Sequence, residues 1–268
     1  MVINTKNISK RLRAIYGIWY RELLLFCRNR ARLFTAIFLP LLGFLVFGTG
    51  FKLILSRDIL GYDFNLFFFP GLLAVSVAIM AFDATMSIVW DKEFGFLKEI
   101  LVSPVSRVDI ALGRFLGAVT RSLIQGLPLM VIAPFIGIPM TFTRIVLTIL
   151  TIIVLCWGVA GIGIILASRI KRLESFGVIM QMMIGPMVVL SGAFFPIHNA
   201  SAWLRIASNF NPLTYGVDSL RFILLESSVK ARIMDIFTTH NFLVSAIVAV
   251  AIAVVTTYFG ILAFKKMK

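Results

Sequence analysis

The sequence predicts an all-α integral membrane protein with six transmembrane helices. Of its 268 residues, 60% are hydrophobic and only 14% are charged, and the mean hydropathy is +0.99. A soluble domain carries about 25% charged residues, so lipid must form part of the solvent around this chain. Several apolar runs also reach the roughly 20 residues that a helix needs to cross a bilayer.

Six such runs follow one another along the chain, and we expect each to form one transmembrane helix. They are residues 33–55, 64–89, 110–136, 145–167, 176–196 and 242–264. Because no internal repeat or linker separates them, residues 1–268 are predicted to form a single transmembrane domain, with the six-span bundle over residues 33–264.

The distribution of Lys and Arg predicts that both termini face the cytoplasm. Eighteen of the 26 basic residues lie in segments 1–32, 90–114, 168–174 and 265–268, the last being a short basic tail, against seven in the segments on the other side. Basic flanks stay on the cytoplasmic side of a membrane. We therefore place the chain in the cytoplasmic (inner or plasma) membrane. The net charge of +14 is attributed to an anionic lipid surface, and no nucleic-acid partner is expected.

Residues 1–32 precede the first span and have the pattern of an amphipathic helix. Apolar side chains recur at intervals of three or four residues on one stripe, namely Ile8, Leu12, Ile15, Trp19, Leu23 and Phe26. Basic side chains occupy the other side of this helix. We expect it to lie in the membrane interface, and the alternative is a helix packed on cytoplasmic protein.

Segment 90–107, between the second and third spans, is longer than a connector needs to be. It combines charged residues with an apolar face at helical spacing, which must be buried against lipid, the N-terminal helix or another protein. We predict a short docking helix on the cytoplasmic side. Its candidate residues are Asp91, Lys92, Glu93, Phe94, Gly95, Phe96, Leu97, Lys98, Glu99, Leu101 and Pro104.

A few polar side chains fall within the apolar spans. Asp83 lies in the second span, and Arg121 and Gln125 lie one helical turn apart in the third. A charge at the bilayer centre costs roughly 2.5–3.5 kcal/mol on insertion scales, so such groups find partners. We expect Asp83 to pair with Arg121, either as a structural ion pair or within a polar patch that lines a substrate path. Gln181, in the Met-rich fifth span, is a candidate for that patch or for plain helix packing.

The segment that follows the fifth span is too broken to cross the membrane and is rich in aromatic residues. Such residues favour the membrane interface. We expect short re-entrant or interfacial helices that cap the outer mouth, with a simple interfacial anchor as the alternative. The candidate residues of this outer cap are Phe194, Phe195, Pro196, Trp203, Asn211, Pro212 and Tyr215.

Two stretches resemble the ABC-2 family of transport permeases. EFGFLKEILVSPVSR (93–107), followed by LGRFLGA (112–118), is similar to that family's coupling-helix region. LSGAFFPIHNASAWLRIASNFNPLTYGVDSLR (190–221) is similar to its block after the fifth span. Within the family, the GFLKE motif (95–99) looks most similar to the daunorubicin-resistance and nodulation-factor exporter branch. Together with the six spans, the resemblance covers most of the chain.

The resemblance implies the permease subunit of an ATP-driven exporter of amphipathic, drug-like, lipid-linked or glycan-linked molecules. Two copies of the chain, or one copy and a paralogue, would form the pore. Two separate ABC ATPase subunits, which hold ATP and Mg²⁺, would dock on the loop around residues 93–101. By the same resemblance, Gly95 permits a close approach or a bend, and Glu93, Lys98 and Glu99 contact the ATPase. The resemblance also implies that the cap after the fifth span forms the extracellular gate.

The chain itself lacks sequence signatures of catalysis. Neither Gly-Lys-Ser nor Gly-Lys-Thr occurs, and a P-loop requires one of them, so we expect no ATPase activity, cofactor or metal on this chain. One alternative is an ion-coupled secondary transporter, against which the spans carry few ionisable groups and show no inverted repeat. The other is a membrane-embedded lipid-modifying enzyme, against which no span carries a metal cluster or a nucleophile–base pair.

Overall fold

The computed structural model describes residues 5–54, 63–97, 99, 105–197, 200–226, 234 and 236–267. Within these residues all regular secondary structure is helical, which confirms the predicted fold class. The helices are α1 (Thr5–Arg28), α2 (Arg30–Ile54), α4 (Phe64–Ala84), α5 (Met86–Glu93), α7 (Arg107–Met130), the 3₁₀ helix η1 (Ala133–Ile136), α8 (Phe142–Arg169), α9 (Leu173–Leu190), α10 (Ala202–Asn209), α11 (Pro212–Leu225) and α13 (Phe242–Lys265).

Five helical stretches among the described residues are long and apolar enough to cross a membrane. They are Arg30–Gly50, Phe64–Glu93, Phe142–Arg169, Leu173–Leu190 and Phe242–Lys265. They lie on five of the six predicted spans. The third predicted span corresponds to α7, which is 24 residues long but carries charged side chains.

Two predicted spans end earlier in the structure than expected. The third was expected to continue to residue 136, but α7 ends at Met130, and a separate 3₁₀ turn follows. The fifth was expected to reach residue 196, but α9 ends at Leu190, and the chain reverses at Gly192, whose φ is +74°. Apolar composition continues through both turns, which is why hydropathy alone did not reveal them.

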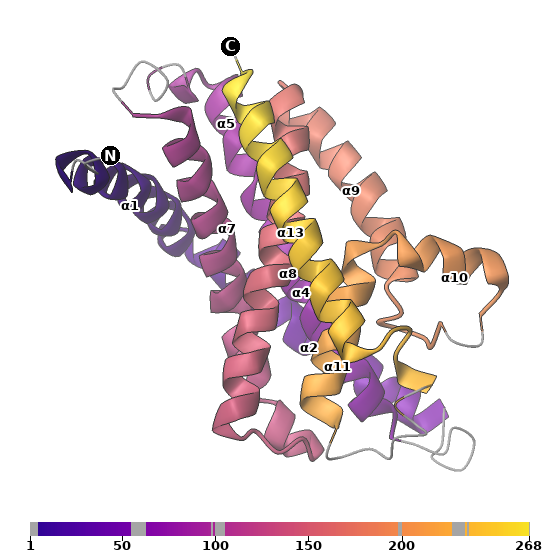
Figure 1. Cartoon of the computed structure of the whole chain (residues 1–268). Helices are drawn as coiled ribbons and strands as arrows, with labels where there is room; N and C mark the ends of the chain where they lie inside the picture. The colour runs from indigo at the N-terminus through magenta and orange to yellow at the C-terminus, as the bar shows by residue number, and fades with distance from the viewer. Residues whose placement is uncertain are drawn as a thin grey trace.

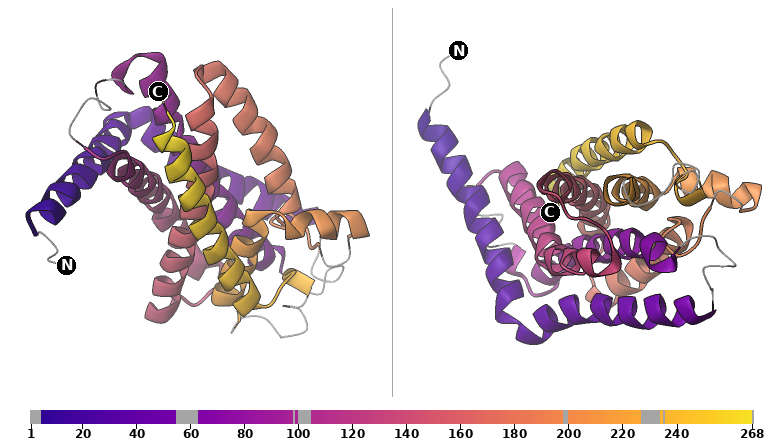
Figure 2. Two further views of the ribbon diagram at one scale, coloured as in Figure 1. Left: turned by 45° about the horizontal axis from the view of Figure 1, so that its top comes forward. Right: turned by 90° about the horizontal axis from the view of Figure 1, so that it is seen from below.

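Helix α4 forms the centre of the bundle. It packs against α2, α7, α8 and α11, and its Phe-rich first turns, from Phe64 to Phe69, are largely buried. Helices α8 and α13 run side by side, while α1 and α2 form an L along the outside (Figures 1 and 2). The most apolar windows of α2 and α9 are only 11% and 6% buried inside the chain, so these helices offer their surfaces to lipid or to another protein.

A glycine permits the close approach of α8 and α13. A Cβ placed on Gly161 would lie 2.5 Å from the Cβ of Thr256, which is shorter than any real contact. Small residues of this kind let helix backbones pack tightly inside a membrane, where no hydrophobic effect drives helices together.

Helix α1 packs along α7, and its buried stripe overlaps the predicted one but is rotated from it. Phe26 is 1% exposed, and Ile15 and Trp19 are half-buried. Leu12, expected on the apolar stripe, is 61% exposed, whereas Glu22 is 2% exposed. Trp19 Nε1 donates a hydrogen bond to Thr120 Oγ1 of α7 at 2.9 Å. Nearer the start of α1, the guanidinium of Arg11 pairs with the carboxylate of Asp109 of α7 at 3.0 Å. The stripe is rotated because polar partners on α7, and not apolar area alone, select the face of α1 that turns inward.

Candidate functional site

The predicted docking segment begins as a continuation of the second span. Helix α4 ends at Ala84, Thr85 makes one turn, and α5 runs on to Glu93. Gly95, with φ of +83°, then breaks the helix. A positive φ is accessible to glycine without steric cost, so this residue permits the bend that the family resemblance implied there. Asp91, Lys92 and Glu93 therefore belong to the end of the span and not to a separate docking helix.

Asp91 points into the protein and not toward a partner. Its carboxylate is 3% exposed and accepts hydrogen bonds from Arg21 of α1, at 2.8 and 2.9 Å, and from Arg114 of α7. The hydrogen bonds to Asp91 raise the pKa of Arg21 above its ordinary value. The residue thus ties α5 to α1 and α7.

Lys92 and Glu93 hold the junction between α8 and α9. The Lys92 ammonium donates to the carbonyl oxygens of Ala167 and Ser168, at 2.6 and 2.7 Å, and to that of Ile170 at 3.2 Å. The Glu93 carboxylate accepts from the backbone N–H of Leu173 at 2.8 Å. A cation therefore sits at the C-terminus of α8 and an anion at the N-terminus of α9, as the helix dipoles favour.

Three aromatic side chains at the end of α5 are exposed. Trp90, Phe94 and Phe96 are 52%, 55% and 49% exposed, and the rings of Trp90 and Phe94 are 4.9 Å apart. We call these three residues the aromatic patch. Leu97, expected on the same face, is instead 4% exposed. Glu99 is exposed. Lys98, Leu101 and Pro104 lie outside the described residues.

A buried charge network that the sequence reasoning missed lies beneath this end of the bundle. Glu22 of α1 binds Arg114 with one carboxylate oxygen and Arg121 with the other, and all three side chains are 2–3% exposed. The one available signal was that Glu22 is the only acidic residue among the first 32. A single acid in a basic amphipathic helix indicates a specific partner.

The predicted Asp83–Arg121 pair is wrong. Asp83 pairs with Arg32 at the start of α2, and Arg121 pairs with Glu22. Consecutive antiparallel spans bring Asp83 and Arg121 to a similar depth. However, Asp83 faces α2 and Arg121 faces α1. The order of the spans along the chain does not reveal these neighbours.

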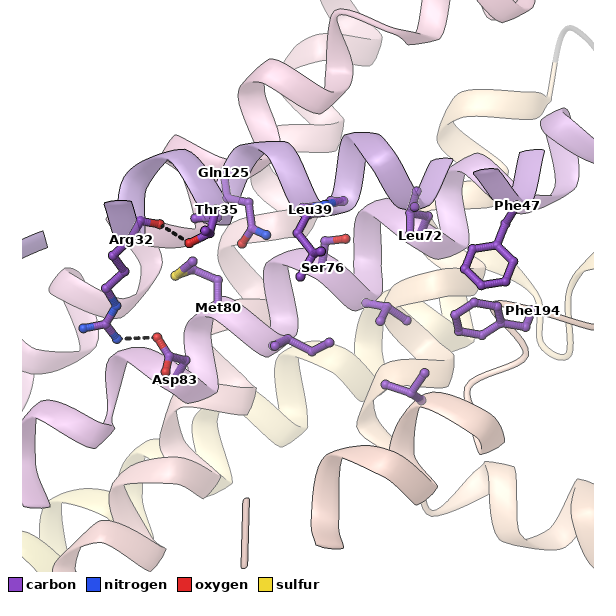
Figure 3. Close-up of a pocket in the computed structure, with 16 residues that line it drawn as sticks. Arg32, Thr35, Leu39, Phe47, Leu72, Ser76, Met80, Asp83, Gln125 and Phe194 are labelled. Carbon is purple, nitrogen blue, oxygen red and sulfur yellow. Dashed lines mark hydrogen bonds and ion pairs between the residues drawn. The ribbon is translucent and has the colours of Figure 1, made fainter. Parts of the chain in front are cut away.

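The Arg32–Asp83 pair lies in a groove between α2 and α4. One end is an apolar cavity of about 510 Å³, which is lined by α2, α4 and Gln125 of α7 and is bordered by Phe194 (Figure 3). The other end is a more polar cavity of about 790 Å³ that reaches Asp91 and Arg121. Three of the four predicted polar residues of the spans thus line one groove. Gln181 does not line it and lies exposed on α9.

The predicted outer gate residues divide into two groups. Phe194, Phe195 and Trp203 are 36%, 37% and 66% exposed. Asn211 is buried, caps α11 by accepting from the N–H of Leu213 at 3.1 Å, and donates to Met187 O at 2.7 Å.

Pro212 opens α11, and Tyr215 donates its hydroxyl to Asn209 O at 2.6 Å. Pro196 is half-buried at the turn after α9. Behind the turn, the buried guanidinium of Arg221 donates to the carbonyl oxygens of Gly192 at 2.7 Å and Phe237 at 2.5 Å. The segment thus contains the two helices α10 and α11, and α11 packs within the bundle against α4, α8 and α13.

The fold and these contacts define an all-helical, multi-pass membrane protein with a buried network of charged groups at one end of the bundle. The sequence profile of the family described as "ABC-2 type transporter" matches residues 13–225. The chain belongs to this family and is a permease subunit of an ABC transporter. The family consists of transport permeases and not of enzymes. The expected resemblance is thereby confirmed.

Curated relatives agree with this assignment. The chain is 28% identical over 244 residues to the putative transport permease ycf38 of Cyanophora paradoxa, which spans 90% of this chain and 83% of the relative. It is 26% identical over 240 residues to the inner membrane transport permease YadH of Escherichia coli K12, and this match covers 88% of the chain and 91% of the relative. It is 26% identical over 175 residues to the probable multidrug ABC transporter permease YbhR of the same organism, and this match covers 62% of the chain and 45% of the relative.

Proposed function

We propose that this chain is the permease of an ATP-driven exporter in the cytoplasmic membrane, energised by a separate ATPase subunit. The observation that carries the proposal is the aromatic patch, since Trp90, Phe94 and Phe96 are exposed beside residues that bind other helices. Exposed aromatic clusters with a polar rim are typical of protein interfaces. The ATPase docks on this patch and on the loop around residues 93–101.

The contacts beside the patch provide a route for movement. A force on the end of α5 reaches α1 and α7 through Asp91, and it reaches the α8–α9 junction through Lys92 and Glu93. Because these contacts are short and charged, displacing α5 displaces its neighbours. Closure of the ATPase dimer around ATP and Mg²⁺, which the partner holds, thus changes the packing of the spans.

The same end of the bundle supports the orientation that we propose. The Arg107 guanidinium donates to the carbonyl oxygens of Lys265 and Met267 at 2.6 Å, so the C-terminal segment lies beside the start of α7. Both lie near the basic α8–α9 junction, and this end of the bundle is cytoplasmic. The N-terminal helix α1 packs along α7 next to it.

The pore forms with a second copy of the chain or with a paralogue. Helix α9 supports this part of the proposal, because it is apolar yet almost unburied within the chain. The cargo is an amphipathic molecule, either drug-like or linked to lipid or glycan. The printed name of YbhR, a probable multidrug permease, supports the drug-like class.

Co-purification tests the docking site. Tagged chain is isolated in mild detergent from its own host, and P-loop ATPases in the eluate are quantified for wild type, Phe94→Ala and Phe96→Ala. We expect each variant to lose about 30-fold or more in ATPase affinity, as for truncation of an interface anchor. Phe135→Ala is the control, because this phenylalanine is 84% exposed at the other end of the bundle.

Three results would contradict the proposal. If all three variants retain the same ATPase, the patch is an interfacial anchor and not the docking site. If active transporter contains no ATPase and its transport depends on the proton gradient, the protein is a secondary transporter. ATPase-independent turnover of a lipid would indicate an enzyme.

A further inference from the structure

The groove between α2 and α4 has an apolar part and a charged part that are continuous. The two cavities share Arg32, Thr35 and Asp83, so the ion pair lies where they meet. Their volumes of about 510 and 790 Å³ are within the range of small-molecule sites, which is about 300–1,000 Å³.

The apolar part opens sideways and not into the core. Leu39 of α2 and Ile79 of α4 line it and are 67% and 37% exposed. Helix α2 itself is almost unburied within the chain. A chain of methylene groups can therefore enter this part of the groove directly from the surrounding bilayer.

Buried polar atoms without partners line both parts. Gln125 is 5% exposed, lines the apolar cavity, and its Oε1 accepts no hydrogen bond (Figure 3). Arg121 is 2% exposed, lines the polar cavity, and its Nε and Nη1 donate none. Native proteins leave few buried polar groups unpaired, and each needs an explanation such as an absent ligand.

The charge balance favours an anion. Four arginines line the groove or the adjoining network, namely Arg21, Arg32, Arg114 and Arg121. Among the residues that the structure describes, they pair with three carboxylates, those of Glu22, Asp83 and Asp91. Unlike the deeper pairs, the Arg32–Asp83 pair is accessible, with side chains 39% and 26% exposed. Arg32 therefore has guanidinium N–H groups available to a ligand.

We infer that this groove binds an anionic phospholipid of the bilayer, with its phosphate at Arg32 and Arg121 and an acyl chain along Leu39, Gly43 and Ile79. Asp83 competes with the phosphate for Arg32. The site lies within one chain. We place the site in the cytoplasmic leaflet, and this placement rests on the orientation in the proposed function. The inference that the groove binds lipid does not depend on that orientation.

Native mass spectrometry of the purified chain, titrated with phosphatidylglycerol or phosphatidylcholine of identical acyl chains, tests the inference. We expect wild type to prefer phosphatidylglycerol. Arg32→Gln lowers that affinity about tenfold, because it removes a charge-assisted contact. Asp83→Asn raises it, because it removes the competing carboxylate. Arg13→Gln, a change at an exposed arginine of α1, leaves it unchanged.

A second pair of variants tests the apolar part without altering charge. No atom lies within 4 Å of a Cβ placed on Gly43 or on Gly50, both in α2, and only Gly43 lines the groove. Gly43→Leu fills the groove and weakens binding of both lipids, whereas Gly50→Leu does not.

Equal binding of the two lipids, unchanged by Arg32→Gln and Asp83→Asn, would overturn the inference and indicate only nonspecific surrounding lipid. Equal binding by Gly43→Leu and Gly50→Leu would remove the acyl-chain site. These outcomes leave the ATPase co-purification unaffected, so a failed groove and a failed docking site are distinguished.

Discussion

The carboxylate of Glu22 in α1 and the guanidinium of Arg121 in α7 form a buried ion pair, with both side chains 2% exposed. Arg114 binds the other oxygen of the same carboxylate. One acid from the N-terminal helix therefore compensates two arginines of α7. Because unpaired charges are costly in a membrane, this contact attaches α1 to the bundle.

Replacing Glu22 by Gln should destabilise the protein by about 3–5 kcal/mol, because it leaves the buried Arg121 without its counter-charge, whereas Arg114 keeps Asp91. Thermal unfolding in detergent measures the effect. Glu174→Gln, at an exposed acid in the first turn of α9, serves as the control and should unfold like wild type. Equal unfolding temperatures for the two variants would show that the network contributes no stability.

Replacing Lys92 by Met should loosen the α8–α9 junction by about 1.5–3 kcal/mol, the usual contribution of hydrogen bonds to a charged group. Hydrogen exchange of the amides at residues 168–173 should become faster. Lys171→Met is the matched control, since Lys171 is an exposed lysine at the same junction. If both variants exchange alike, the lysine charge and not its position matters.

Replacing Gly161 by Ala should destabilise the bundle by about 1–3 kcal/mol, as overpacking usually does. The new methyl group would lie 2.5 Å from Thr256 and 2.9 Å from its backbone carbon, which cannot move away alone. Gly177→Ala in α9 provides the comparison, because no atom lies within 4 Å of its Cβ position. The difference between the two unfolding temperatures measures the cost of separating α8 and α13.

The two cysteines should report the orientation. Cys27 is exposed in α1, and Cys156 is buried in α8. A membrane-impermeant maleimide should label Cys27 in inside-out vesicles but not in right-side-out vesicles, and Cys156 should react only after denaturation. Labelling of Cys27 from the opposite side would reverse the proposed orientation and remove the docking site from the cytoplasm.

Sequence patterns located most helices, because the hydrocarbon core requires apolar runs of a set length. The family resemblance also indicated a bend at Gly95, where the positive φ that glycine permits decides the local structure. Sequence patterns failed for contacts between distant residues. Leu12 was assigned to the wrong face of α1, and Asp91 was expected to face a partner, although both are ordinary members of amphipathic patterns.

By itself, the sequence specified an all-helical membrane protein, the approximate positions of its spans and, through two motifs, its transporter family. Only the tertiary structure decided that Asp83 pairs with Arg32, that Glu22 serves Arg114 and Arg121, and that a groove lies between α2 and α4. Periodicity defines the faces of one helix, but the rotation and stagger of neighbouring helices depend on packing along their whole length. The partner of each buried charge is therefore a property of the assembled bundle.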